Sequence, residues 1–123
     1  MANEITITGS LVLNRSAAPK FSQSMKYSGI QSDQTGVDYM CGSQVITTGE
    51  ENLDKGNDIG TIGYFMLKNL HATNSVTIGT STGELPIKVL AGQAVGPVYV
   101  DAAEVIVLAS GSATTIEYLI IEK

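Results

Sequence analysis

Apolar and polar residues alternate along the first predicted element, residues 4–14. Four apolar residues form one face: Ile5, Ile7, Leu11 and Leu13. A period of two is typical of a β-strand that packs one face and turns the other toward water or a partner. Gly9 interrupts the packed face and is a candidate β-bulge. Val12 is the one apolar residue on the opposite face.

The alternation resumes over residues 21–27, after a loop that contains Pro19. Because proline donates no hydrogen bond to a β-ladder, residues 15–20 are expected to separate two strands. The loop is short enough to close at little entropic cost, so the two strands can pair as a wide hairpin. The next segment, residues 28–38, is polar and predicts a turn or an irregular edge.

Short β-like segments fill the rest of the chain. Residues 37–48 predict a third strand, broken at Gly42. Residues 63–70 are apolar on both faces, which indicates a central strand or one covered by another subunit. Pro86 places the strand over 85–89 at a sheet edge or at a strand start. Further strands are expected over these ranges: 75–79, 94–100, 105–109 and 114–121.

This pattern predicts an all-β fold with about eight or nine antiparallel strands and no helix. Eight strands in two sheets joined by regular turns favour a jelly-roll-like β-sandwich. An immunoglobulin-like sandwich is the alternative, disfavoured because its Cys–Trp–Cys pattern is missing. A chain of 123 residues is expected to form a single β-sandwich domain over 1–123. Its first strand, residues 1–15, is a candidate arm between subunits.

Charge is sparse. Only 15% of the residues are charged, with a net charge of −5, against about 25% in a usual soluble domain. Basic residues do not cluster, so we expect no nucleic-acid partner. The apolar run 105–109 is too short to span a membrane, and no leader precedes the first strand, so no membrane partner is expected. Cys41 is the single cysteine and is expected to be a half-buried residue outside any internal disulfide.

No group of residues predicts catalysis, so we expect neither an enzyme nor a cofactor. His71, the single histidine, falls in a predicted turn without a second ligand or a catalytic partner. The turn between Gly79 and Gly83 lacks the Lys-Ser/Thr ending and the helix of a phosphate loop. The acidic loop Glu50–Asp58 departs from the EF-hand pattern and predicts a solvated connection, with a calcium loop as the alternative.

Three stretches carry a resemblance to a known group of proteins: residues 1–7, 47–53 and 63–79. In the related sequences the third stretch is followed by a strand, a turn of the type Leu90-Ala-Gly-Gln93 and a final hydrophobic strand. All of these occur here in the same order. The chain therefore resembles small virion structural proteins of tailed bacteriophages.

The resemblance implies a non-enzymatic virion protein, assembled in the host cytoplasm. The first expectation is a capsid decoration or cement protein that binds between capsomers. Its expected partners are the major capsid protein and other copies of itself, with which it forms a homotrimer. The alternative is a tail, fibre or baseplate component that adapts a receptor-binding protein or binds host carbohydrate through exposed tyrosines: Tyr39, Tyr64, Tyr99 and Tyr118. The contact with a subunit or the capsid is expected at five residues: Ile5, Ile7, Leu11, Val12 and Leu13.

Overall fold

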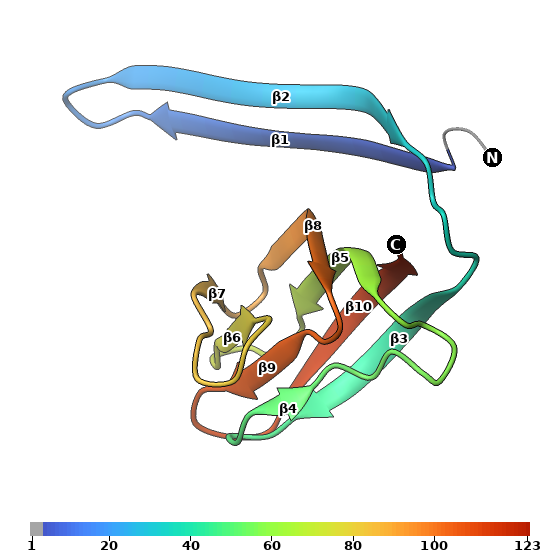
Figure 1. The fold of residues 1–123 in the computed structure, drawn as a ribbon. Coiled ribbons are helices and arrows are strands. Elements are labelled where there is room, and N and C mark those ends of the chain that lie inside the picture. The colour runs from blue at the N-terminus through green and yellow to red at the C-terminus, as the bar shows by residue number, and fades with distance from the viewer. Residues whose placement is uncertain (1–3) are drawn as a thin grey trace. The chain divides into compact units, whose positions relative to one another are not determined.

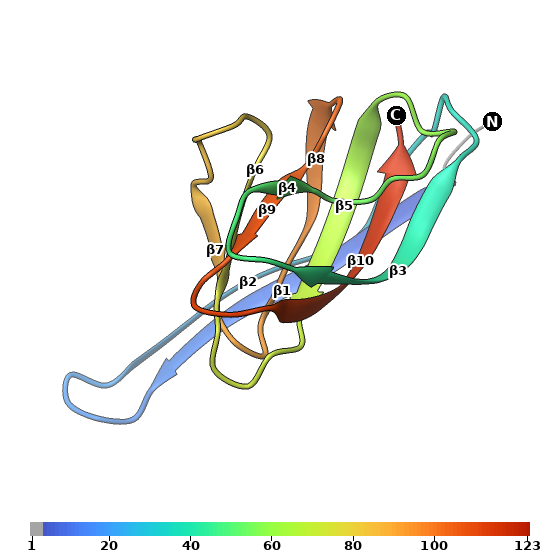
Figure 2. The same ribbon diagram turned by 90° about the horizontal axis from the view of Figure 1, so that it is seen from below.

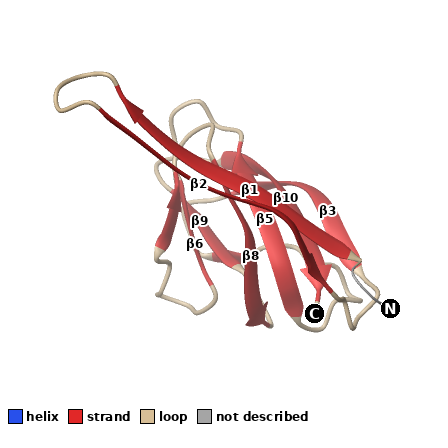
Figure 3. Ribbon diagram, turned by 90° about the horizontal axis from the view of Figure 1, so that it is seen from above, coloured by secondary structure: helices blue, strands red, loops and turns tan. Residues whose placement is uncertain are grey.

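The computed structural model describes residues 4–123. Contacts divide the chain into two units, the first ending at Thr35 and the second spanning Gly36–Lys123. Ten strands and no helix occur among the described residues (Figure 3). Every pair of strands is antiparallel, so the all-β prediction is confirmed. It follows that the described part holds no helix able to cross a membrane.

The first unit is a long hairpin of β1 (Ile5–Arg15) and β2 (Phe21–Ser32) (Figure 1). The predicted hairpin is confirmed, and its register shifts beside Gly9, as expected for a bulge. The additional residue lies on β2, where Gly29 adopts a φ of 67°. Of the turn or irregular edge predicted over 28–38, the first part is the irregular end of β2, because the ladder continues past this bulge to Ser32.

The second unit contains two four-stranded sheets (Figure 2). The strand order is β3-β10-β5-β8 in one sheet and β4-β9-β6-β7 in the other. The strands have these bounds: β3 (Tyr39–Ile46), β4 (Glu51–Asn52), β5 (Ile62–Asn69), β6 (Val76–Gly79), β7 (Ile87–Val89), β8 (Ala94–Ala102), β9 (Ile106–Ala109) and β10 (Thr114–Glu122).

Two predictions about strand position are confirmed. β5 lies between β10 and β8, which explains why its residues are apolar on both faces. β7, which follows Pro86, is an edge strand. One strand was not predicted. This strand, β4, is a two-residue pairing within the acidic loop and has too few residues to show a pattern in the sequence.

The core of the second unit lies between the two sheets. Phe65 and Ile120 contribute to it from one sheet, and Ile78 and Val107 from the other. All four are almost fully buried, and each stabilises the fold by about 1.5–3 kcal/mol relative to an exposed side chain. Because one core joins both sheets, this unit is built like a β-sandwich.

Candidate interaction surfaces

The hairpin has one apolar face. In an antiparallel ladder, directly paired residues project to the same side. The pairs Leu11–Met25, Gly9–Tyr27 and Ile7–Ile30 therefore place the apolar residues of both strands together. The opposite side pairs Ser10 with Lys26 and is polar apart from Val12. The apolar face contains these residues: Ile5, Ile7, Leu11, Leu13, Met25, Tyr27 and Ile30.

Much of this face is exposed. Leu11 is 77% exposed and Met25 is 73% exposed, and Leu13 and Ile30 are exposed as well. An isolated two-stranded hairpin is marginally stable in water, because its single apolar face has nothing to pack against. An exposed apolar face of this kind is typical of a surface that binds another protein.

The five predicted contact residues fall in three different places. Leu11 and Leu13 lie on the exposed part of the apolar face. Val12 is also exposed, but on the polar side. Ile5 and Ile7 are buried.

The sequence interpretation left out the residues that β2 adds to this face. Met25 and Tyr27 could have been included, since the alternation over 21–27 already placed them on the packed side of that strand. Ile30 could not be assigned to this face from the sequence, because the bulge changes the phase of the alternation between Tyr27 and Ile30.

A second apolar surface covers the outer face of the β3-β10-β5-β8 sheet. In its centre Leu119 of β10 pairs with Cys41 on one side and Met66 on the other. In the neighbouring row Ile121 pairs with Tyr39 and Tyr64. A hollow of about 870 Å³ lies on this face, and Cys41, Met66 and Leu119 contribute to its lining.

Several residues of this outer face are exposed. Tyr39 is 68% exposed and Met66 is 42% exposed. Cys41 is exposed too, so the prediction of a half-buried cysteine is wrong. The reason is its position on β3, since Cys41 projects away from the core that Ile46 enters on the same strand.

Three of the four candidate sugar-binding tyrosines lie on this outer face. Tyr64 and Tyr99 make an edge-to-face contact, with ring centroids 5.1 Å apart. Tyr39 lies in the same row of the sheet. Tyr118 instead enters the core, where its hydroxyl donates a 2.6 Å hydrogen bond to the carbonyl oxygen of Asp54. Burial, with the nearby charge of Asp54, raises the pKa of Tyr118.

The two units differ in charge. Residues 1–35 contain three basic and two acidic side chains, which gives a net charge of +1. Residues 36–123 contain four basic and ten acidic side chains, which gives −6. The two values add to the −5 of the whole chain. The hairpin is therefore a weakly cationic arm, and the second unit is acidic.

The carboxylates of the acidic loop serve separate local contacts. Glu50 accepts a 2.9 Å hydrogen bond from the amide of Gly83, Glu51 accepts one from Thr47, and Asp54 accepts one from Gly56. Within residues 4–123, no three His, Cys, Asp or Glu side chains gather as metal ligands would. The loop connects strands through these bonds.

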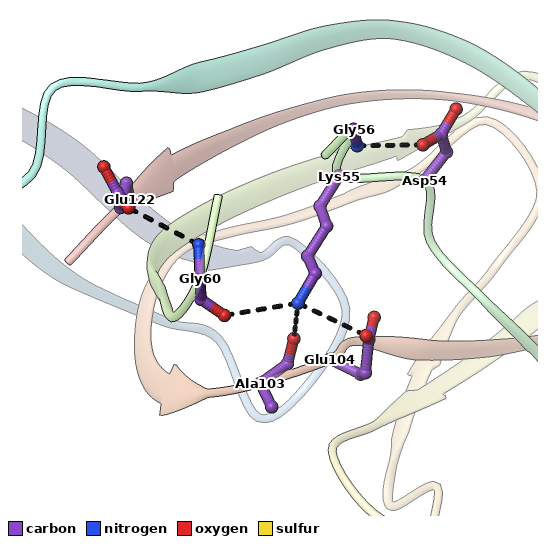
Figure 4. A network of polar contacts seen from close by, with 7 residues as sticks. All are labelled: Asp54, Lys55, Gly56, Gly60, Ala103, Glu104 and Glu122. Carbon is purple, nitrogen blue, oxygen red and sulfur yellow. Dashed lines mark hydrogen bonds and ion pairs between the residues drawn. The ribbon is translucent and has the colours of Figure 1, made fainter. Parts of the chain in front are cut away.

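Lys55 fastens the same loop to two other segments (Figure 4). Its ammonium group donates to the carbonyl oxygens of Gly60 and Ala103 and forms a 3.2 Å ion pair with Glu104. These contacts explain why a loop rich in polar residues adopts a defined conformation. The role of Lys55 is therefore structural.

Glu122 fixes the start of the second unit. Its carboxylate accepts hydrogen bonds from the amides of Val37 at 3.0 Å, Asp38 at 3.2 Å and Gly60 at 3.4 Å. Gly36 leaves room for this carboxylate, because a Cβ there would come within 2.1 Å of it. The hydrogen bonds from Asp38, Val37 and Gly60 lower the pKa of Glu122 below its ordinary value of 4.5.

Acid should destabilise the second unit through Glu122 and Glu51. Burial alone would raise the pKa of Glu51, but hydrogen bonds from Thr47 and Gln44 outweigh it and lower the value. Since both folded-state pKa values lie below 4.5, the stabilisation is present above about pH 4.5 and is lost as the pH falls through the lowered values. Urea unfolding midpoints between about pH 7 and about pH 3 should show this loss.

Glu122→Gln provides the test of that assignment. This variant keeps the shape of the side chain but not its charge, so its urea midpoint should fall less steeply with acid than that of the wild type. Glu117→Gln removes a charge from the exposed side of β10 and is the matched control. Equal acid dependence in Glu122→Gln and in the wild type would contradict the role given to Glu122.

His71 and the Gly79–Gly83 turn have structural roles. The Nδ1 atom of His71 accepts hydrogen bonds from the amides of Thr73 at 3.0 Å and Asn74 at 2.8 Å, in agreement with the prediction of a turn residue. The amide of Gly83 is bonded to Glu50, a carboxylate that would repel a bound phosphate.

The chain matches no protein-family model, no curated protein and no solved structure.

Proposed function

We propose that this chain is a non-enzymatic structural protein of a bacteriophage virion, and specifically a capsid decoration or cement protein. The observation that carries the proposal is the pair of exposed apolar surfaces, one on the hairpin and one on the β3-β10-β5-β8 sheet. Exposed apolar surfaces of this extent are typical of protein interfaces. The resemblance of residues 1–7, 47–53 and 63–79 to phage virion proteins indicates which assembly they serve.

The topology proposed for residues 36–123 is a jelly roll. When the eight strands of this unit are counted from one, the sheet orders become 1-8-3-6 and 2-7-4-5. Strands from opposite ends of the sequence are thus neighbours, as in a sheet pair formed by two Greek keys. This arrangement supports the jelly-roll expectation over an immunoglobulin-like sandwich.

The proposed mechanism is mechanical. The protein binds between capsomers. Its partners are the major capsid protein and further copies of itself, with which it forms a homotrimer. Burial of apolar area stabilises such contacts by about 25 cal/mol per Å² before the costs of association. Binding that favours assembled capsomers over separated ones opposes their separation. Among the predicted contact residues Leu11, Val12 and Leu13 are exposed, and Leu11 and Leu13 lie on the apolar face.

The alternative location is a tail, fibre or baseplate, where the protein binds host carbohydrate or adapts a receptor-binding protein. The observation that favours it is the outward row of tyrosines, in which Tyr39 and Tyr99 are exposed and Tyr64 is half-buried, since aromatic rings can stack on sugars. The sheet that carries this row also carries the apolar residues Met66 and Leu119, which favour a protein partner.

Copy number distinguishes these locations. Purified particles of the phage that encodes the chain should contain it in hundreds of copies if it decorates the capsid, on the order of the number of capsomer contacts. Quantitative gel analysis against the major capsid protein gives this ratio. A handful of copies would indicate the tail location, and particles that lack the chain would overturn the virion role altogether.

A further inference from the structure

We propose that the hairpin of one copy packs its apolar face onto the outer face of the β3-β10-β5-β8 sheet of a second copy. The apolar face of the hairpin and the outer face of the sheet then cover each other, and the two belong to different copies of the chain. This contact rests on the self-association in the proposed function and specifies which surfaces of two copies meet, and it can be tested on the purified protein apart from the virion role.

Both surfaces need a partner, and they have matching chemistry. The hairpin offers aliphatic side chains such as Leu11 and Met25 on a two-stranded ribbon that is marginally stable in isolation. The sheet offers Met66 and Leu119 around a hollow of about 870 Å³. Packing a ribbon on a sheet keeps strands stacked face to face, the usual way in which β-layers bury apolar surface.

Charge favours a second copy as the occupant. The hairpin carries +1 and the second unit −6, so the arm of one molecule is attracted to the sheet unit of another. Beside the contact itself the charges are balanced, because Glu117 pairs with Lys68 at the hollow and Lys26 projects from the polar side of the hairpin. The opposite net charges of the two units would guide encounter from a distance and oppose association between two acidic sheet units.

The size of the arm points to reciprocal exchange. A ribbon of two strands is about 10 Å wide and, over the part of β1 beyond the buried Ile5 and Ile7, residues 9–15, about 23 Å long. One seated arm therefore covers about 230 Å² on each partner, less than a third of the roughly 800 Å² per partner of a standard stable interface. A copy that both gives and receives an arm buries about twice that area, so a closed ring or an exchanged dimer is favoured over a single contact.

Cys41 is a natural reporter for this contact, because it is the single cysteine and lies beside Leu119 on the receiving face. The experiment mixes two chains. The donor chain carries Cys41→Ser together with one new cysteine on the apolar face of the hairpin, Leu11→Cys or Met25→Cys. The receiving chain is the wild type, so that a disulfide between donor and receiver can form only between molecules.

Oxidation of the mixture should give a donor–receiver disulfide that non-reducing gels and mass spectrometry identify. Ser10→Cys and Ser24→Cys, on the polar side of the same strands, are the matched donors and should cross-link at least about tenfold less, because their side chains face away. Equal cross-linking from the two sides of the hairpin, or none from the apolar side, would overturn the proposal.

The oligomeric state gives a second test. In sedimentation velocity the wild type should be larger than a monomer, and the double variant Leu11→Glu/Met25→Glu should be a monomer with an unchanged far-ultraviolet dichroism spectrum. Ser10→Glu/Ser24→Glu adds the same charge to the polar side and should keep the oligomer. A monomeric wild type, or an apolar-side variant that stays an oligomer, would overturn the proposal.

Discussion

Replacing Asn69 with leucine should lower the free energy of unfolding by about 3–6 kcal/mol. Asn69 is fully buried at the end of β5. Its amide nitrogen donates to the carbonyl oxygens of Asn74 at 2.7 Å and Val89 at 3.2 Å, and its amide oxygen accepts from the backbone of His71 at 2.9 Å. Leucine would leave three backbone groups without these partners, each at a cost of about 1–2 kcal/mol, since two of the three bonds are only partly buried. Urea titration of both proteins measures the difference.

His71→Ala is the comparison that isolates this effect. It removes the ring nitrogen that accepts two amides of the same turn, but the amide of Thr73 lies in an exposed part of the turn and can bond to water. Its cost should therefore be about 1 kcal/mol or less. If His71→Ala proved as damaging as Asn69→Leu, the turn would depend on the histidine, and the role assigned to Asn69 would be wrong.

This contrast also shows what the sequence could and could not reveal. His71 drew attention because histidine is often functional, and sequence reasoning correctly assigned it to a turn. Asn69 had no such signal, because an asparagine near a turn is ordinary. What distinguishes it is burial beside Val89, a residue of another strand, and such a contact depends on tertiary structure.

Local patterns predicted the elements better than their partners. The alternation over 4–14 located β1, and apolar residues on both faces of 63–70 correctly indicated a central strand. The pairing of β3 with β10, however, joins opposite ends of the second unit, and no local pattern specifies such a contact. The two-residue strand β4 is likewise formed by its partner β9 and not by its own sequence.

The candidate surfaces were only partly predictable for the same reason. Leu11 and Leu13 followed from the alternation of one strand. Their grouping with Met25 needed the hairpin register, and the apolar outer face of the sheet needed the order of four strands. Cys41 was misjudged because which side of β3 faces the core depends on its pairing with β10.

Substitutions of two adjacent residues on β5, one on each face of the β3-β10-β5-β8 sheet, should differ in their effect on the free energy of unfolding. Phe65 points into the core and is almost fully buried, so Phe65→Ala should lower the free energy of unfolding by about 3–5 kcal/mol through lost burial and a new cavity. Met66 points outward beside Leu119. Met66→Ser should change stability by about 0.5 kcal/mol or less. Thermal unfolding at a protein concentration low enough to dissociate oligomers compares the two.

The outward residue should instead matter for association. If Met66 forms part of the receiving surface, Met66→Ser should shift the sedimentation profile toward smaller species, while its thermal midpoint as a monomer stays close to that of the wild type. Thr115→Ser, at an exposed site on β10 outside the rows of Leu119 and Ile121, is the matched control and should alter neither measurement. A Met66→Ser protein that unfolds as readily as Phe65→Ala would show that the outer face is needed for folding. The two sides of β5 would then not divide into a core and a binding surface.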